Sequence, residues 1–430
     1  MSHAELLARH RKVLPSWLTL FYEQPIELVD GKGCRVVDGE GNTYLDFFAG
    51  ILTTMLGYNL PEVVEAVRDQ AGRMVHSSTL YLIRQQVELA ERIAALSGIP
   101  DAKVFFTSSG TEANEAALLL ATTARRSNQV LALRNSYHGR SFAAMGVTGN
   151  RGWLASSLTP VNVRHVQGGY RYRSPFRDLP DDRYIRACVD DLREVLETTT
   201  AGDVACMIAE PIQGVGGFAT PPDGLFGAMK EVLDQYGILF VADEVQTGWG
   251  RTGEHFWGYQ AHGIVPDAIT FAKGLGNGLA IGGVAARADL MDAVTANSIS
   301  TFGGNPLAAR GALAVLDYLQ EQDLQANARR VGGRLAAGLR DLGARHPLVG
   351  DVRGKGLMLG VELVEAGTMT PNPAAAARVQ EATRRGGLLV GKGGLYGNVL
   401  RIAPPLTLTE AEADEGLAIL ASALAAADTG

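Results

Sequence analysis

The sequence predicts an α/β fold. The prediction comprises a large domain with a mostly parallel central sheet and a smaller α+β domain built from the N-terminal arm and C-terminal part. Between about residues 60 and 310, short β-branched runs alternate with helix-like stretches, which is typical of a parallel sheet. Beyond residue 310 the strands and helices no longer alternate strictly, which indicates a separate unit. At 430 residues, the chain is also too long for one ordinary core.

Six apolar runs of the large domain are predicted to be buried strands, namely 103–107, 129–133, 204–209, 238–242, 268–272 and 283–286. Helices are predicted from Gly110 and over about 189–199 and 224–236. Asn305 and Pro306 have the residue types that cap and begin a further helix. The C-terminal part adds helices near 325–342, 373–386 and 409–427, and strands near 348–353, 357–363, 388–390 and 399–402. We expect a hairpin turn at 39–42 and divisions at 1–50, 51–310 and 311–430.

Composition and charge exclude several classes of protein. Apolar residues make up 46% of the chain and charged residues 20%, which is typical of globular domains and not of disordered ones. The formal charge of −7 favours neither nucleic acid nor an anionic membrane as a partner. The 3 cysteines are far apart and form no CxxC pair, so we expect neither disulfides nor a metal site. Without a signal-peptide pattern or a membrane-length apolar run, the expected location is cytoplasmic.

Lys273 is the first candidate for chemistry. It ends the apolar run at 268–272 and precedes a turn rich in glycine, at Gly274, Gly276 and Gly278. Partial burial would lower its pKa and make the amine nucleophilic, as Schiff-base chemistry requires. Taken alone, a lysine that extends from a strand end into solvent is the more common interpretation.

Asp243 is the second candidate, because it ends the apolar run at 238–242. Open α/β sheets bind ligands at the carboxyl edge of their strands. A buried carboxylate at that edge needs a partner, and a protonated pyridinium nitrogen would provide one. A helix cap or metal ligand of a P-loop enzyme is the alternative, but no GxxxxGK[ST] sequence is present.

Two further junctions follow predicted strands. Ser109, Gly110 and Thr111 open a predicted helix, and a helix N-terminus flanked by glycine and hydroxyls suits a phosphate group. Ser109 with Glu112 also predicts a capping box, and the two interpretations are compatible. Tyr137, in Tyr137–Gly139, could stack on a flat cofactor, although ordinary loop packing is the more common role of such a residue.

Taken in order, the phosphate turn, the aromatic residue, the acid and the lysine are the parts that a pyridoxal-phosphate (PLP) site requires. They resemble the class III aminotransferases of the fold type I group, over a stretch from Tyr44 to Pro405. Several segments are similar to the alanine–glyoxylate type within that family. They are Asp46–Ile51, Glu210–Val215, Thr301–Pro306, Gly350–Leu357 and Gly387–Gly391.

The resemblance implies a role for each site residue. Lys273 would hold PLP as a Schiff base, and Asp243 would pair with its ring nitrogen. Arg401 would bind the substrate carboxylate, and Thr301 would contact the cofactor phosphate of a second subunit, so a homodimer is the smallest expected unit. The remaining cofactor residues are assigned as a group: Ser109, Gly110 and Thr111 at the phosphate, Tyr137 and Val245 on the ring faces, Gln246 at the phenolic oxygen, and His138 nearby.

Substrate choice rests on positions near Arg401. Relatives that act on ornithine or 4-aminobutyrate carry a glutamate where this chain has Val215, so a free Arg401 favours pyruvate or glyoxylate as acceptor. Ile51 is also assigned to the substrate site. Arg140 has two open interpretations, a second carboxylate contact or a residue that faces solvent.

The implied reaction moves an amino group from an amino acid or ω-amino donor to a small 2-oxo acid, with Lys273 transferring the proton. A PLP-dependent racemase, epimerase, mutase or decarboxylase on the same scaffold remains the alternative. A DNA-binding regulator would need a basic domain, and a nicotinamide dehydrogenase would need GxGxxG in an early βαβ unit. The sequence contains neither feature.

Overall fold

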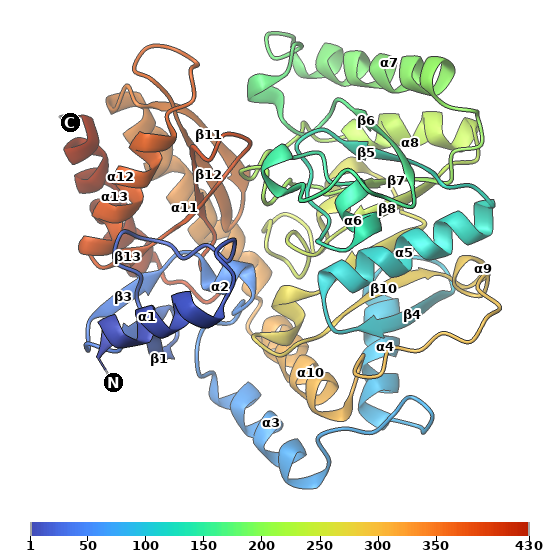
Figure 1. The fold of residues 1–430 in the computed structure, drawn as a ribbon, viewed down its shortest axis with the longest axis horizontal. Coiled ribbons are helices and arrows are strands. Elements are labelled where there is room, and N and C mark those ends of the chain that lie inside the picture. Colours follow the sequence, from blue (N-terminus) through green and yellow to red (C-terminus); the bar gives the residue numbers. More distant parts are fainter. Residues whose placement is uncertain (1, 429–430) are drawn as a thin grey trace.

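A seven-stranded sheet forms the centre of the computed structural model, which describes residues 2–428 (Figure 1). Its strand order is β4-β10-β9-β8-β7-β5-β6. Strands β5 to β9 pair in parallel, whereas β10 runs antiparallel to both β4 and β9. The strands are β4 (Ala102–Thr107), β5 (Gln129–Leu133), β6 (Asn162–Val166), β7 (Cys206–Ala209), β8 (Leu239–Asp243), β9 (Ala268–Phe271) and β10 (Gly282–Arg287). The predicted α/β class with a mostly parallel central sheet is confirmed.

Successive side chains of the central strands belong to two separate apolar cores. In β5, Leu131 and Leu133 join one cluster, while Val130 and Ala132 join the other. The same alternation holds along β7, β8 and β9, because neighbouring strand residues point to opposite faces. Both faces are therefore buried, which explains why these strands appear in the sequence as continuous apolar runs.

Two smaller sheets lie outside the central one, and the first of them joins the N-terminal and C-terminal parts of the chain. One has the order β1-β2-β3-β13, in which β13 pairs parallel with β3, and the other is the antiparallel sheet β11-β12-β15-β14. In Figure 1 the first and last segments accordingly lie on the same side, away from the central sheet. The strands are β1 (Leu28–Lys32), β2 (Arg35–Asp38), β3 (Thr43–Asp46), β11 (Val349–Lys355), β12 (Met358–Leu363), β13 (Leu388–Leu389), β14 (Gly391–Gly393) and β15 (Val399–Ile402).

Helices form many of the connections between the strands. They are α1 (His3–Val13), α2 (Ala49–Leu52), α3 (Pro61–Arg73), α4 (Arg84–Leu96), α5 (Gly110–Arg125), α6 (Phe142–Gly146), α7 (Asp181–Thr199), α8 (Leu225–Gln235), α9 (Ala288–Met291), α10 (Pro306–Glu321), α11 (Leu324–Arg345), α12 (Pro373–Arg385) and α13 (Glu410–Asp428). Asn305 caps α10 by accepting from the Ala308 N–H at 3.0 Å, as its position predicts. Residue 310 lies inside α10, so we propose that the C-terminal unit begins after this helix and not at 311.

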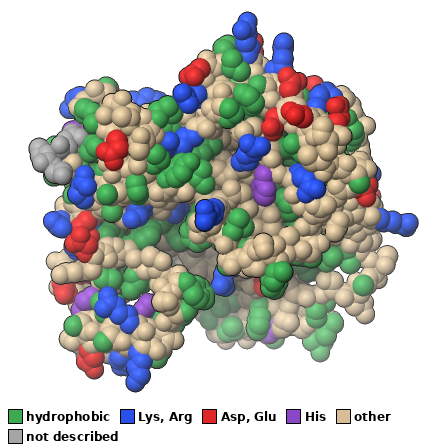
Figure 2. Space-filling model, turned by 45° about the horizontal axis from the view of Figure 1, so that its top comes forward, with side chains coloured by type: hydrophobic (Ala, Val, Ile, Leu, Met, Phe, Trp, Pro, Cys, Tyr) green, Lys and Arg blue, Asp and Glu red, His purple; other side chains and the backbone are tan. Residues whose placement is uncertain are grey.

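No helix within residues 2–428 combines the length and the apolar character needed to cross a bilayer. On the face drawn in Figure 2, Lys and Arg side chains are interspersed with Asp and Glu. This face therefore has no continuous surface of one charge.

The segment after β3 has an unusual backbone. All four residues from Ala49 to Leu52 have positive φ, between 48° and 66°. Residues other than glycine rarely adopt this conformation. The buried carboxylate of Asp46 holds the start of this segment, accepting hydrogen bonds from the N–H groups of residues 48 and 49 at 2.7 and 3.1 Å. The Tyr58 hydroxyl, at 2.7 Å, is its third donor.

We expect Asp46→Ala to lower the free energy of unfolding by about 3 kcal/mol, because it leaves buried donors without an acceptor. Asp69→Ala is the matched control, since it breaks an exposed pair with Arg73 and should cost less than about 0.5 kcal/mol. Chemical denaturation of both variants measures the difference. Equal effects would show that Asp46 does not secure this segment.

Candidate active site

A cavity of about 130 Å³ lies at the carboxyl edge of the central sheet. Strands β4, β5, β7, β8 and β9 all end beside it, so the residues that follow them meet at one place. Its lining includes Ser109, Gly110, Thr111, Asn114, Tyr137, His138, Gly139, Glu210, Asp243, Val245, Gln246 and Lys273. The cofactor residues expected from the sequence are therefore brought together, except Thr301.

Asp243 is buried and makes hydrogen bonds on both oxygens. Its Oδ2 accepts from the Asn114 amide at 2.8 Å and lies 2.7 Å from His138 Nδ1, while Oδ1 accepts from the Val245 N–H at 3.1 Å. A carboxylate offers about four lone-pair sites, so one acceptor site is left for a cofactor nitrogen. Asn114 is in turn oriented by the Thr270 hydroxyl, which donates to its carbonyl oxygen at 2.6 Å.

Lys273 follows β9 and adopts a φ of 43°, in the left-handed region. Strain of this kind is concentrated at functional sites, where the surrounding structure holds it. Burial lowers the pKa of the Lys273 ammonium, while the nearby carboxylates of Asp243 and Glu210 oppose that shift. A lysine that gives up its proton more readily than one in water is suited to attack a carbonyl carbon.

The N-terminus of α5 forms another wall of the cavity. Ser109 caps this helix by accepting from the Glu112 N–H at 3.2 Å. In a complete capping box the Glu112 carboxylate would accept from the Ser109 N–H. Here it accepts from the Ser108 N–H at 2.6 Å, so only the first of the two predicted hydrogen bonds forms. A Cβ at Gly110 would lie 3.1 Å from the Val245 side chain, so the glycine allows the start of α5 to pack closely against Val245. Free N–H groups at a helix start could hold a phosphate.

Glu210 and Asn114 line the cavity but were not assigned to the site from the sequence. Glu210 directly follows β7, so the logic applied to Asp243, an acid at the end of an apolar strand, would have found it. It accepts from the Tyr137 N–H and the Gly214 N–H, both at 2.9 Å. Burial raises its pKa to about 7, and the Asp243 carboxylate adds to this effect.

Arg401, on β15, is buried and has no carboxylate partner among the described residues. Its guanidinium donates to the carbonyls of Gly214 at 3.4 Å and Lys392 at 3.2 Å, and within the same part of the chain its Nε has no hydrogen-bond partner. The rings of Phe48 and Phe218 lie 4.8 and 5.8 Å from the guanidinium carbon. Burial lowers the pKa of Arg401 to about 10, against the opposing field of Glu210. A substrate carboxylate would supply the missing partner.

Arg401 does not line the cavity, and three other predicted residues also lie outside its lining. Thr301 is exposed in the loop before α10. Ile51 is 47% exposed in the left-handed segment after β3. Arg140 is exposed, with its guanidinium carbon 5.4 Å from the centre of the Trp17 ring.

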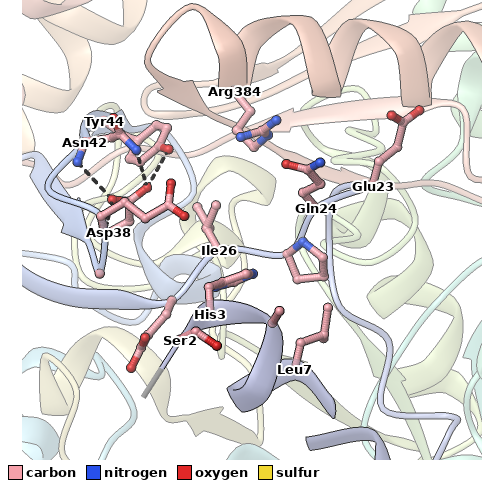
Figure 3. A pocket seen from close by; sticks show the side chains of 15 residues that line it. Ser2, His3, Leu7, Glu23, Gln24, Ile26, Asp38, Asn42, Tyr44 and Arg384 are labelled. Atoms are coloured by element: carbon pink, nitrogen blue, oxygen red, sulfur yellow. Dashed lines mark hydrogen bonds between the residues drawn. The ribbon is translucent and has the colours of Figure 1, made fainter.

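A larger cavity, of about 690 Å³, lies between the start of α1, the β2–β3 turn and Arg384 of α12 (Figure 3). Its buried Asp38 is already occupied, since it accepts from Asn42, from the Glu40 N–H and from the Tyr44 hydroxyl. Lysine and cysteine are missing from the described residues of its lining. We therefore place the candidate active site at the edge of the central sheet.

Comparison with known proteins agrees with this geometry. The family model of class III aminotransferases matches residues 22–424. The chain belongs to this family. Alanine–glyoxylate aminotransferase 2 homolog 2, mitochondrial, of Arabidopsis thaliana is 40% identical over 413 residues, which cover 95% of this chain and 85% of that protein.

Two further proteins are similar to this chain over most of its length. Leucine/methionine racemase of Thermococcus litoralis is 36% identical over 435 residues, covering 100% of this chain and 97% of that protein. The structure of an amine transaminase from an uncultivated Pseudomonas species, in its PLP-bound form, superposes with a TM-score of 0.89. Its identity is 31%, and the match covers 94% of this chain and 95% of that one. This aminotransferase-family enzyme therefore uses pyridoxal phosphate.

The residues at the cavity suit that cofactor. Gln246 Oε1 and His138 Nε2 are buried without hydrogen-bond partners among residues 2–428, and Asp243 keeps one acceptor site. Lys273 could hold the aldehyde carbon, and the start of α5 could hold the phosphate. The polar groups of the cavity are thus complementary to an aromatic ring that carries a phosphate and a basic nitrogen.

We expect Lys273→Ala to keep the fold but to lower turnover by about a thousandfold, since the amine that holds the cofactor and moves the proton is lost. In the parent protein, borohydride reduction should fix the cofactor on the peptide that carries Lys273, and mass spectrometry detects this. Lys103→Ala, which removes an exposed partner of Asp292, is the control. A variant at position 273 with native turnover would contradict the assignment.

Proposed function

We propose that the protein moves an amino group from an amino acid or ω-amino donor to a small 2-oxo acid, with pyruvate or glyoxylate favoured. The observation that carries this proposal is Arg401, a buried cation near the Lys273 cavity whose hydrogen-bond acceptors in the described chain are backbone carbonyls alone. An arginine left in this state favours substrates that bring a carboxylate.

The residues of the chain would divide the work as follows. Pyridoxal phosphate supplies an aldehyde carbon that takes up the amino group and a ring that accepts electrons. Asp243 keeps the ring nitrogen protonated, because His138 and Asn114 hold its carboxylate in place. Lys273 would hold the aldehyde carbon and, as a free amine, would move a proton at the substrate carbon that carries the nitrogen. Arg401 binds the carboxylate of donor and acceptor in turn.

The acceptor preference rests on the turn at residues 214–217. A Cβ at Gly214 would lie 2.3 Å from the Gln246 side chain, and one at Gly216 would lie 2.6 Å from Asn135. Gly217 has a φ of 91°, which disfavours a side chain. Val215 therefore occupies the only position of this turn that readily accepts a side chain, and it cannot neutralise Arg401. In 2-oxoglutarate the second carboxylate would need another cation, for which Arg140 is the candidate.

A racemase, epimerase, mutase or decarboxylase remains the second candidate. The full-length similarity to a leucine/methionine racemase favours keeping it, because one scaffold and one cofactor serve both reactions. The two reactions differ in one requirement: transamination needs a 2-oxo acid, whereas racemisation does not. Incubating a single amino acid with and without pyruvate distinguishes them.

We also propose a homodimer. Thr301 lies outside the cavity of its own chain, in keeping with a role at a second subunit's cofactor. Two apolar side chains near it in the chain are exposed, Ile299 at 59% and Phe302 at 62%. Exposed apolar surface of this kind is typical of an interface.

A cytoplasmic location is proposed as well. Its support is that the cysteines are free and buried, as in a protein of a reducing compartment. The Arabidopsis relative carries the designation mitochondrial, so the mitochondrial matrix is the alternative. Fractionation of the source cells would distinguish the two.

We expect kcat/KM to be higher with pyruvate or glyoxylate than with 2-oxoglutarate. Arg401→Ala should lower it at least about 100-fold for each acceptor, since a desolvated charge pair is lost. Val215→Glu should weaken all three acceptors by placing a carboxylate beside Arg401, with Val215→Gln as the uncharged control. A preference for 2-oxoglutarate that disappears in Arg140→Ala would overturn the proposed acceptor.

Mixed dimers test the role of Thr301. Lys273→Ala and Thr301→Ala should each be impaired alone at limiting cofactor. In a mixed dimer, the subunit that carries the Thr301→Ala substitution keeps its own Lys273 and receives Thr301 of the partner subunit, so one intact site forms. Mixing should restore activity, to at most about half of the parent value in a population of mixed dimers. A fully active monomer in sedimentation would rule the arrangement out.

A further inference from the structure

The turn at residues 214–217, named the glycine turn here, is held at every residue by a hydrogen bond from outside it. The bonds are Gly214 N–H to Glu210 at 2.9 Å, Gly394 N–H to the Val215 carbonyl at 3.0 Å, Asn135 to the Gly216 carbonyl at 3.0 Å, and Arg353 Nε to the Gly217 carbonyl at 3.0 Å. The turn in turn supplies the Gly214 carbonyl that accepts from Arg401. A displacement of the turn would therefore reach the guanidinium directly.

Arg353 differs from the other anchors because a buried ionic cluster holds it. Its Nη1 donates to Asp351 at 2.7 Å and to Glu362 at 2.8 Å. Glu362, on β12, is fully buried and also accepts from Arg173 Nε and from the Tyr170 hydroxyl, both at 2.6 Å. Three separate segments of the chain, at residues 170–173, 351–362 and 217, therefore meet at one arginine.

The charges of this cluster keep it ordered. Burial is the largest single effect and acts to lower the pKa of Arg353, but Glu362, Tyr170 and Asp351 together outweigh it, so the net shift of the pKa is upward and the guanidinium stays charged. The Tyr170 ring lies 5.0 Å from the Arg353 guanidinium carbon, which restricts the plane of the fork. A planar fork donates to Gly217 and to Glu362 at the same time, which a lysine ammonium on a flexible chain does not reproduce.

We propose that Arg353 is a positioning residue for carboxylate recognition: anchored by Glu362, it fixes the glycine turn and, through Gly214, the orientation of Arg401. This inference rests on the proposed role of Arg401. Arg353 lies behind the turn and does not line the cofactor cavity. Its loss should therefore weaken substrate carboxylate binding and leave the chemistry at Lys273 intact.

The test uses the purified holoenzyme and propionate, an unreactive monocarboxylate, as a competitive inhibitor against the oxo acid. In Arg353→Lys we expect the inhibition constant for propionate and KM for the oxo acid to rise about tenfold, the equivalent of losing one charge-assisted contact. kcat should change less than about twofold, and cofactor content should not change. Arg177→Lys is the matched control, because Arg177 and Arg353 both line a second cavity, of about 420 Å³, but Arg177 pairs with Asp178.

Tyr170→Phe is the milder second variant. It removes one donor from Glu362 without touching the turn, so a smaller rise in the same two constants supports the proposal, even if Arg353→Lys does not fold. Constants equal to those of Arg177→Lys in every folded variant would overturn it, as would a fall in kcat alone. The variant Arg401→Ala distinguishes a failure of the proposed role of Arg401 from a failure of the proposed role of Arg353. If that variant also binds propionate normally, the role of Arg401 fails, whereas a loss of binding there alone refutes only the role of Arg353.

Discussion

The burial of the Asp243 carboxylate is the constraint on which the rest of the site depends. A charged group at the end of an apolar strand is costly to bury unless it is hydrogen-bonded. His138 and Asn114 meet this need from the β5 loop and from α5, which fixes both elements against the end of β8. Because β8 and β9 are parallel, their carboxyl ends lie at the same edge of the sheet, and Lys273 after β9 therefore lies near Asp243 at the end of β8.

Arg401 is also buried, but unlike Asp243 it lacks an oppositely charged partner among the described residues. Arg401 has aromatic faces and backbone carbonyls around it, but no carboxylate from the described residues pairs with it. Glu210 opposes the effect of burial on the pKa of Arg401, and it also accepts hydrogen bonds from the Tyr137 N–H and the Gly214 N–H. Glu210 thus connects the lining of the cavity with the turn that accepts a hydrogen bond from Arg401, and in the proposed function a substrate carboxylate would pair with that arginine.

Sequence patterns predicted six of the seven strands of the central sheet, because the inner strands are buried on both faces and are therefore mostly apolar. β6 was missed because its residues Arg164 and His165 interrupt that pattern. Position at a strand end made Asp243 and Lys273 candidates, although it was not applied to Glu210, which directly follows β7. Asn114 lies inside an alanine-rich helix and shows its role only through its contact with Asp243. The cluster at Glu362 could not be predicted, since its members are far apart in the chain and meet only through tertiary packing.

These two halves of the site are built by different parts of the fold. The cofactor residues extend from the central sheet, whose register is fixed by two buried faces. Arg401, the proposed substrate arginine, lies on β15, in an antiparallel sheet that contacts the glycine turn. Changes in the second sheet can therefore alter which group is held near the cofactor while the cofactor residues keep their places. That separation is a physical reason why aminotransferases and a racemase can share this scaffold along its full length.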